Sequence, residues 1–533
     1  MRHDPSSGLR PPSPRKRGEG LPALPLAPLA GRVWHAAPGE GRCIAALFVF
    51  FLTLTAHAQL TTTALTGRVF SGEAPAAGVT VNVTSPALQQ PRSATTNADG
   101  FYFIDALPPG TYEVSFSRTG LSSLIRPALL ELGRIARADA HLEVNADEDS
   151  VTSTILPVSV VDETEPTSHF DEGDLERLPL PSPISAAVLA PGRIDGPVLV
   201  DDVEAEGFIG YETVEQLTVF RGERSLVVAR THAGGEQISL ALRDTYFQHE
   251  GHVFETASGG RIIAEKLWFF AGGWGGIEDG FNIKLTAQPH AAHNLTATWL
   301  DANDESNLGL RYTGVFTERL VGEVLASEES AARVSYVLGN HVLAANVGED
   351  EWLVSDRWSH RRLVVDAGAR HKDGDTSWRA GAIYDIRGNG RQALTASAGE
   401  ELVSAGFLGA IGSTGVARVD WLRRDETGED ELQLDVRYSL FNRLFTGGSY
   451  TYVDTDAHRG NAWVSAQLPI GEHEITMTLL ERHERDAWAS DFALRYAIPV
   501  RSVRLTVGGD ITNTFASDVL EPRSWRVFAR AHL

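Results

Sequence analysis

The chain has 533 residues, a net charge of −23 at pH 7 and a single cysteine, Cys43. This length exceeds what one ordinary hydrophobic core organises, so several domains are expected. The acidic balance argues against a protein that binds nucleic acid through phosphates, and one cysteine excludes both an internal disulfide and a thiolate zinc cluster.

Two N-terminal segments are not expected to belong to the mature fold. Residues 1–32 are rich in Pro, Arg and Gly without periodicity, which indicates a disordered extension or an overcalled start site. Residues 33–58 contain a short apolar run and then the small-x-small sequence Ala56-His57-Ala58, which predicts a signal peptide cleaved before Gln59. The alternative is a cytosolic protein with a buried apolar helix.

Residues 59–145 alternate short apolar strands with strong turn signals, which predicts a small β-sandwich. The segments GVTVNV, TNADGFYFI and LPPGTYEV resemble the carboxypeptidase regulatory-like domain, a transthyretin-like sandwich often grouped with carbohydrate-binding-like folds. The resemblance implies an accessory module without peptidase activity. The apolar residues expected to point inward are Phe101, Phe103, Ile104, Tyr112, Val114 and Phe116.

A polar linker is expected at 146–168, and it contains the apolar stretch ILPVSVV at 155–161. An extended, Val-rich stretch in polar surroundings favours pairing with the sheet edge of another protein. A spare edge strand of this chain would explain the same pattern equally well.

Residues 169–235 mix short helical patterns with short strands, which predicts a small α/β domain. The pieces LERLPLP, VLVDDV, VEQLTVFRG and AGGEQISLALR resemble the plug of TonB-dependent outer-membrane receptors, in the Oar-like branch that also carries the regulatory-like module. The family has Asp-Gly where this chain has Asp201-Asp202, although Asp also tolerates turns. The signature positions implied by the resemblance are Asp201, Arg221, Gly222, Gly234 and Gly235.

The stretch GGRIIAEKLWFFAGGWGG at 259–276 raises three readings. It lacks the Lys-Ser/Thr or third glycine of a phosphate loop, and its apolar run is about half of a membrane helix. It resembles the family motif in which a glycine pair precedes an aromatic run, which implies an early barrel strand with small residues where the plug lies against the wall. The matching residues are Gly259, Gly260, Trp268, Phe269 and Phe270.

Residues 236–533 repeat segments of about 10 residues with one apolar and one polar face, as lipid-facing barrels do. In FNIKLTAQ, for example, Phe281, Ile283, Leu285 and Ala287 share one face. The sequence predicts 20 to 22 antiparallel strands with short turns, closed between a first strand near 237–243 and a last strand near 525–533. Aromatic residues at segment ends, where interface girdles fall, include Trp299, Tyr312 and Trp421.

The fold class expected for the whole chain is mainly β: a transmembrane barrel of about 22 strands holding a small α/β plug, preceded by the sandwich. No catalytic, cofactor or metal site is expected. The spacing of His169 and Glu172 matches a zinc-carboxypeptidase pair, but a matching partner histidine is absent from the sequence. Arginines in and just after the plug are instead expected to pair with lumen acids such as Asp435; they are Arg221, Arg224, Arg230 and Arg243.

The resemblance implies energised uptake of a bulky substrate across the outer membrane of a Gram-negative bacterium, with the N-terminal domain in the periplasm. Its implied partners are outer-membrane lipid, the barrel-assembly machinery and a TonB-type energy-coupling protein, which would contact Val158, Ser159, Val160 and Val161. The barrel segments leave little chain for the long external loops of typical relatives. A structural or adhesive barrel without transport therefore stays an alternative, as does a periplasmic protein whose sandwich binds carbohydrate.

Overall fold

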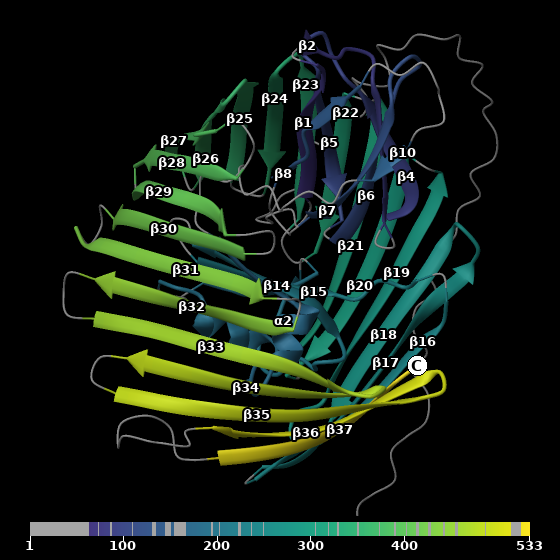
Figure 1. Cartoon of the computed structure of the whole chain (residues 1–533), viewed down its shortest axis with the longest axis vertical. Coiled ribbons are helices and arrows are strands. Elements are labelled where there is room, and N and C mark those ends of the chain that lie inside the picture. Colours follow the sequence, from purple (N-terminus) through teal and green to yellow (C-terminus); the bar gives the residue numbers. More distant parts are fainter. Residues whose placement is uncertain are drawn as a thin grey trace, which may run out of the picture. The chain divides into compact units, whose positions relative to one another are not determined.

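The computed structural model describes residues 63–533 except 131–134, 144–150, 154–166, 513–523 and gaps of one to three residues, mostly in turns. β-strands dominate the described part of the chain (Figure 1). The expected extension, the signal peptide and the stretch Val158–Val161 lie outside the described residues.

The N-terminal strands form two five-stranded sheets. In the first sheet, β1 pairs with β2, β5, β8 and β9; in the second, the order is β10-β7-β6-β3-β4. The strands are β1 (Thr63–Ser71), β2 (Ala74–Pro75), β3 (Thr80–Ser85), β4 (Leu88–Thr95), β5 (Phe101–Leu107), β6 (Gly110–Ser117), β7 (Ser123–Leu130), β8 (Ile135–Arg137), β9 (Ala140–Leu142) and β10 (Val151–Ser153).

The core of these two sheets corrects the expectation for β5. Tyr102 and Ile104 join Tyr112, Val114 and Phe116 in one buried cluster. Phe101 and Phe103 are also buried, but they belong to a separate cluster with Ala64. The expectation placed Phe103 and Ile104 on one face, which was wrong because neighbouring residues of a strand point to opposite faces.

The plug is a five-stranded sheet of order β11-β14-β15-β12-β13 with two short helices. β12 runs parallel to β15, and the other neighbours are antiparallel. Buried apolar side chains from both helices and from the strands form its core. The elements are β11 (Thr167–Asp171), α2 (Glu172–Arg177), the 3₁₀ helix η1 (Ile184–Leu189), β12 (Val198–Val200), β13 (Val203–Glu204), β14 (Val214–Arg221) and β15 (Ser225–Thr231).

The C-terminal strands β16 to β37 close into an antiparallel barrel of 22 strands in the described part of the chain, as expected. Its strands are β16 (Ser239–Phe247), β17 (Gly251–Ile263), β18 (Leu267–Gly275), β19 (Gly280–His290), β20 (His293–Ala302), β21 (Glu305–Thr317), β22 (Leu320–Ala326), β23 (Ala331–Leu338), β24 (His341–Val347), β25 (Glu351–His360), β26 (Leu363–Lys372), β27 (Asp375–Asp385), β28 (Gln392–Gly399), β29 (Leu402–Ile411), β30 (Gly415–Arg424), β31 (Asp430–Leu440), β32 (Leu444–Val453), β33 (Ala457–Ile470), β34 (His473–Glu484), β35 (Ala487–Val500), β36 (Val503–Thr512) and β37 (Ser524–His532).

The barrel closes where β16 pairs with β37, from Ala241 opposite His532 to Phe247 opposite Arg526. The first strand therefore begins two residues later and ends four residues later than the expected 237–243. The chain between consecutive barrel strands is short, from two residues up to the eleven of 513–523.

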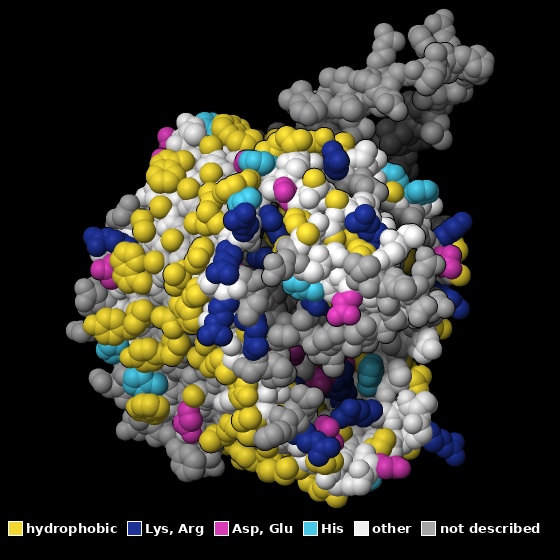
Figure 2. All heavy atoms as spheres, turned by 45° about the horizontal axis from the view of Figure 1, so that its top comes forward, with side chains coloured by type: hydrophobic (Ala, Val, Ile, Leu, Met, Phe, Trp, Pro, Cys, Tyr) yellow, Lys and Arg dark blue, Asp and Glu magenta, His cyan; other side chains and the backbone are white. Residues whose placement is uncertain are grey.

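The wall has a polar inner face and an apolar outer face, as the alternation predicts. On β19, Asn282 and Lys284 are buried toward the lumen, whereas Ile283 and Leu285 between and beyond them are 36% and 41% exposed. Trp299 and Trp421 are also exposed on the outside. Figure 2 shows apolar side chains gathered over a broad part of the molecular surface.

Within the described residues, neither length nor hydropathy allows any helix to cross a bilayer.

Candidate functional site

The interface between the plug and the inner wall of the barrel is the candidate functional site. Apolar residues of both parts share one buried cluster, in which Leu175 and Leu217 of the plug join Trp274, Leu300 and Trp463 of the wall. The plug core is therefore completed by the barrel.

Small residues set how closely the plug approaches the wall. A Cβ added to Gly234 would lie 2.3 Å from the carbonyl oxygen of Phe269 and 2.8 Å from that of Gly260, both in the wall backbone. On β18, a Cβ at Gly272 would lie 2.5 Å from Oγ1 of Thr213 in the plug. These contacts leave no room for a side chain at either glycine.

Arg221 at the end of β14 is a buried cation of the plug. Its guanidinium donates to the side-chain oxygen of Gln433 on β31 and, at 3.1 Å, to the carbonyl oxygen of Thr167. Gln433 donates in turn to Glu431 at 2.9 Å. Burial lowers the pKa of Arg221 to about 10, although Asp435 opposes the shift. The wall therefore binds Arg221 through the side-chain amide of Gln433, whereas a direct ion pair with an acid such as Asp435 was expected.

Asp201 and Lys284 form a buried ion pair between plug and wall, with 3.1 Å from Nζ to the carboxylate. Thr231 donates to the same carboxylate through its hydroxyl and, at 3.2 Å, through its backbone N–H. Asp201 has φ 47°, the left-handed conformation that a turn at this point requires. An Asp side chain tolerates that conformation better than most residues do, so Asp201 forms the turn without a glycine.

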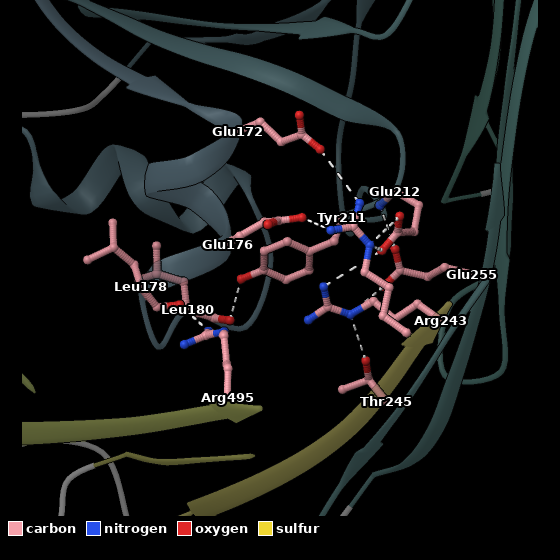
Figure 3. Close-up of polar contacts among 11 residues, drawn as sticks. Glu172, Glu176, Leu178, Leu180, Tyr211, Glu212, Arg243, Thr245, Glu255 and Arg495 are labelled. Carbon is pink, nitrogen blue, oxygen red and sulfur yellow. Dashed lines mark hydrogen bonds and ion pairs between the residues drawn. The ribbon is translucent and has the colours of Figure 1, made fainter. Parts of the chain in front are cut away.

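Arg530 on β37 collects three carboxylates of the plug (Figure 3). Its Nε lies 2.8 Å from Glu212, and its terminal nitrogens pair with Glu176 and, at 3.6 Å, with Glu172. Glu172 and Glu176 project from α2, whereas Glu212 lies in the loop before β14. One wall side chain thus ties two separate elements of the plug.

Close to Arg530, the aromatic ring of Tyr211 lies among charged side chains. Tyr211 stacks under the guanidinium of Arg243 on β16, 4.3 Å from the ring centroid, and its hydroxyl donates to Leu180 at 2.5 Å. Glu255 on β17 accepts the backbone N–H of Glu212 at 2.9 Å. Figure 3 shows Tyr211 beside these labelled charged side chains.

The wall also satisfies the C-terminal carbonyl groups of α2. Asp171 caps the first turn, because its side chain accepts the N–H of Asp174 at 2.7 Å. At the other end, Arg495 of β35 donates to the carbonyl of Arg177 at 2.8 Å and to that of Leu178 at 3.1 Å (Figure 3). Such carbonyls have no partner inside a helix, so this short helix depends on the barrel.

The remaining residues expected to matter from the sequence lie on β17, on β18 and in the segment before β16, or outside the described residues. Gly259 and Gly260 lie on β17; Trp268, Phe269 and Phe270 lie on β18, with Trp268 and Phe270 buried on the lumen side. Gly235 follows Gly234 without its close contacts. Gly222 and Arg224 lie outside the described residues.

No sequence signal marks the roles of Arg530, Arg495 or Glu212. Arg530 and Arg495 alternate with apolar residues as any lumen side chain does, and each meets a partner more than 300 positions away in the chain.

Among the described residues, no group of three or more His, Cys, Asp or Glu side chains could hold a metal ion. His169 instead shares a hydrogen bond with Oγ1 of Thr218 at 2.9 Å.

Known proteins resemble both the N-terminal sandwich and a longer part of the chain. Residues 64–143 match the carboxypeptidase regulatory-like domain. The TonB-dependent transporter Oar of Myxococcus xanthus is 32% identical over 299 residues, which cover 44% of this chain and 27% of Oar. The chain thus matches about a quarter of the length of this relative.

Two solved receptors share the fold. The ferric-catecholate import receptor Fiu of E. coli has a TM-score of 0.54 at 8% identity, over 70% of this chain and 97% of Fiu. The siderophore receptor PiuA of Acinetobacter baumannii has a TM-score of 0.52 at 7% identity, over 70% of this chain and 97% of PiuA.

These relatives are transporters and receptors rather than enzymes. The chain is therefore similar to the transporter Oar over part of its length, matches the regulatory-like domain at 64–143 and shares the fold of these two receptors.

Proposed function

We propose that the protein is an energised outer-membrane transporter whose plug moves from the wall when a TonB-type energy-coupling protein pulls on the N-terminal side of the plug. The observation that carries the proposal is the nature of the plug–wall contacts. Beside the apolar cluster that the two parts share, Arg221, Lys284, Arg495 and Arg530 join them through ion pairs and hydrogen bonds. These polar contacts can be exchanged for water once the interface opens.

The mechanical link in this proposal is the stretch Val158–Val161, which precedes β11 of the plug by a few residues. Extended Val-rich segments pair with exposed sheet edges through their backbone. Force applied there reaches β11 first, and Ser168 on β11 holds the wall by a 2.6 Å hydrogen bond to Asp435. We assign β1 to β10 to the accessory sandwich, β11 to β15 to the plug and β16 to β37 to the barrel. The plug assigned in this way begins at Thr167, two residues before the expected 169, and β10 falls within the expected linker 146–168.

The test uses a wall residue that the plug covers. Ser449 on β32 is buried and donates to the carbonyl of Leu189 in the plug at 2.7 Å. Because Cys43 lies in the expected signal peptide, Ser449→Cys supplies a unique thiol, and a small maleimide should label it in energised cells. Adding Val160→Pro, which removes a backbone donor from the stretch, should reduce labelling severalfold.

A cysteine at exposed Ser502 is the control and should be labelled equally in both backgrounds. Equal labelling of the Ser449→Cys thiol with and without Val160→Pro would contradict the proposal and favour a structural or adhesive barrel, whose plug stays in place.

A further inference from the structure

The two rims of the barrel carry opposite charge. β16 begins and β37 ends at the same rim, because Ala241 pairs with His532. The N-terminal domains precede β16, and the proposed function places them in the periplasm, so we take this as the periplasmic rim. Every second turn of the barrel lies on it. We call the exposed cations of those turns the basic rim; they are Lys266, Arg319, Arg361, Arg362, Arg387, Arg443 and Arg501. A further arginine of the turn that holds Arg387, Arg391, is half-buried and is not included.

Few carboxylates accompany the basic rim. Among the described turn residues of the periplasmic rim, the acidic side chains are Glu265 and Glu472. The described turns of the opposite rim hold no Lys or Arg and five carboxylates: Glu250, Glu278, Asp279, Glu400 and Glu429. In a chain with a net charge of −23, chance distribution of charge does not favour a cationic rim.

The cations of the basic rim have no anionic partner in the described part of the molecule. None of the seven forms a salt bridge to a described carboxylate, in contrast to the lumen arginines, and Arg362 donates only to the carbonyl of Ile386, at 3.1 Å. Their charge is therefore available to a group outside the chain.

The basic rim lies directly beside the lipid-facing surface. Ile263 precedes Lys266 and is 52% exposed, Tyr384 precedes Arg387 and is 45% exposed, and Val500 precedes Arg501 and is 46% exposed. Figure 2 shows a row of Lys and Arg side chains along the edge of an apolar surface. Cations at this height reach the head groups of the bilayer while their stems lie along its apolar part.

We infer that the basic rim binds the phosphate groups of anionic phospholipids in the periplasmic leaflet of the outer membrane. Arginine suits this ligand because its planar guanidinium can donate two parallel hydrogen bonds to one phosphate. Because the turns repeat around the barrel, they would place such lipids along the rim at which β16 begins, after the N-terminal domains. The acidic opposite rim would not select them.

The test measures lipid selectivity at the barrel perimeter. The purified protein is reconstituted in phosphatidylcholine vesicles with trace spin-labelled phosphatidylglycerol or phosphatidylcholine, and the motionally restricted fraction of each label is compared. We expect phosphatidylglycerol to be favoured by roughly fivefold, the preference that one basic side chain provides at an anionic surface. In salt of about 1 M, where charges are screened within about 3 Å, the preference should approach one.

The variant Arg361→Gln/Arg362→Gln/Arg387→Gln should lose most of the preference. Its matched control, Glu250→Gln/Glu400→Gln/Glu429→Gln at the opposite rim, should retain the preference or increase it. Assembly of each variant is checked by its migration on gels before and after boiling, and Arg443→Gln/Arg501→Gln gives an independent pair. Equal restriction of both lipids by the unaltered protein, or an undiminished preference in assembled rim variants, would overturn the inference.

Discussion

Asp201 both forms a turn of the plug and binds the plug to the wall. Its backbone adopts a left-handed turn, and its carboxylate accepts Thr231 of the plug and Lys284 of the wall. Burial alone would raise the pKa of Asp201, but Lys284, Arg230 and the hydrogen bond from Thr231 lower the pKa below its ordinary value.

This shift predicts an acid-dependent contribution to stability. The ionised carboxylate stabilises the folded chain above the unfolded-state pKa of about 3.9, and the contribution is lost as pH falls through the lower folded-state pKa. Asp201→Asn leaves Lys284 buried without its counter-ion and should lower the free energy of unfolding at pH 7 by about 3 kcal/mol. Urea unfolding between pH 7 and pH 3 should show this difference shrinking toward acid pH; a difference independent of pH would refute the assignment.

The short helix α2 is stabilised by the barrel wall through Arg495. A helix of six residues has little stability of its own, and Arg495 supplies donors to its last carbonyls. Arg495→Gln should therefore destabilise the helix by about 1 to 2 kcal/mol, and the amides of Leu175 to Leu178 should exchange hydrogen roughly tenfold faster or more. Arg504→Gln is the control, since Arg504 forms an exposed pair with Glu474 that contributes little. Equal exchange in the two variants would show that the wall does not support the helix.

Elements could be predicted from the sequence where a periodic pattern specified them. The alternation of Ile283 and Leu285 with Lys284 indicates a wall strand without any knowledge of its neighbours. The start and end of β16 could not be placed so well, because its strand continues through the charged pair Arg243 and Asp244, which a sequence pattern marks as a turn. The contacts of Arg530 could not be predicted at all. Alternation assigns a side chain to a face, but it does not say which plug residue lies opposite.

Closure of the barrel is a property of the whole molecule and has a specific register. Leu242 on β16 lies opposite Ala531 on β37, and directly opposed residues of an antiparallel pair have Cβ atoms about 4.5–5.5 Å apart. Cysteines at these two positions should form a disulfide on mild oxidation, detected as a mobility shift that a reductant reverses. The out-of-register pair Leu242→Cys/Phe528→Cys should not; if both pairs crosslink equally, β16 and β37 do not hold this register.

The pairing of β16 with β37 also bears on assembly of the barrel, because it joins the first and the last strand of the wall. Side chains that grip the plug belong to both ends of the wall: Lys284 on an early strand, Arg495 and Arg530 on late ones. A folded plug therefore offers the first and last strands a common template, and its own charges help to bring the two edges of the nascent sheet together.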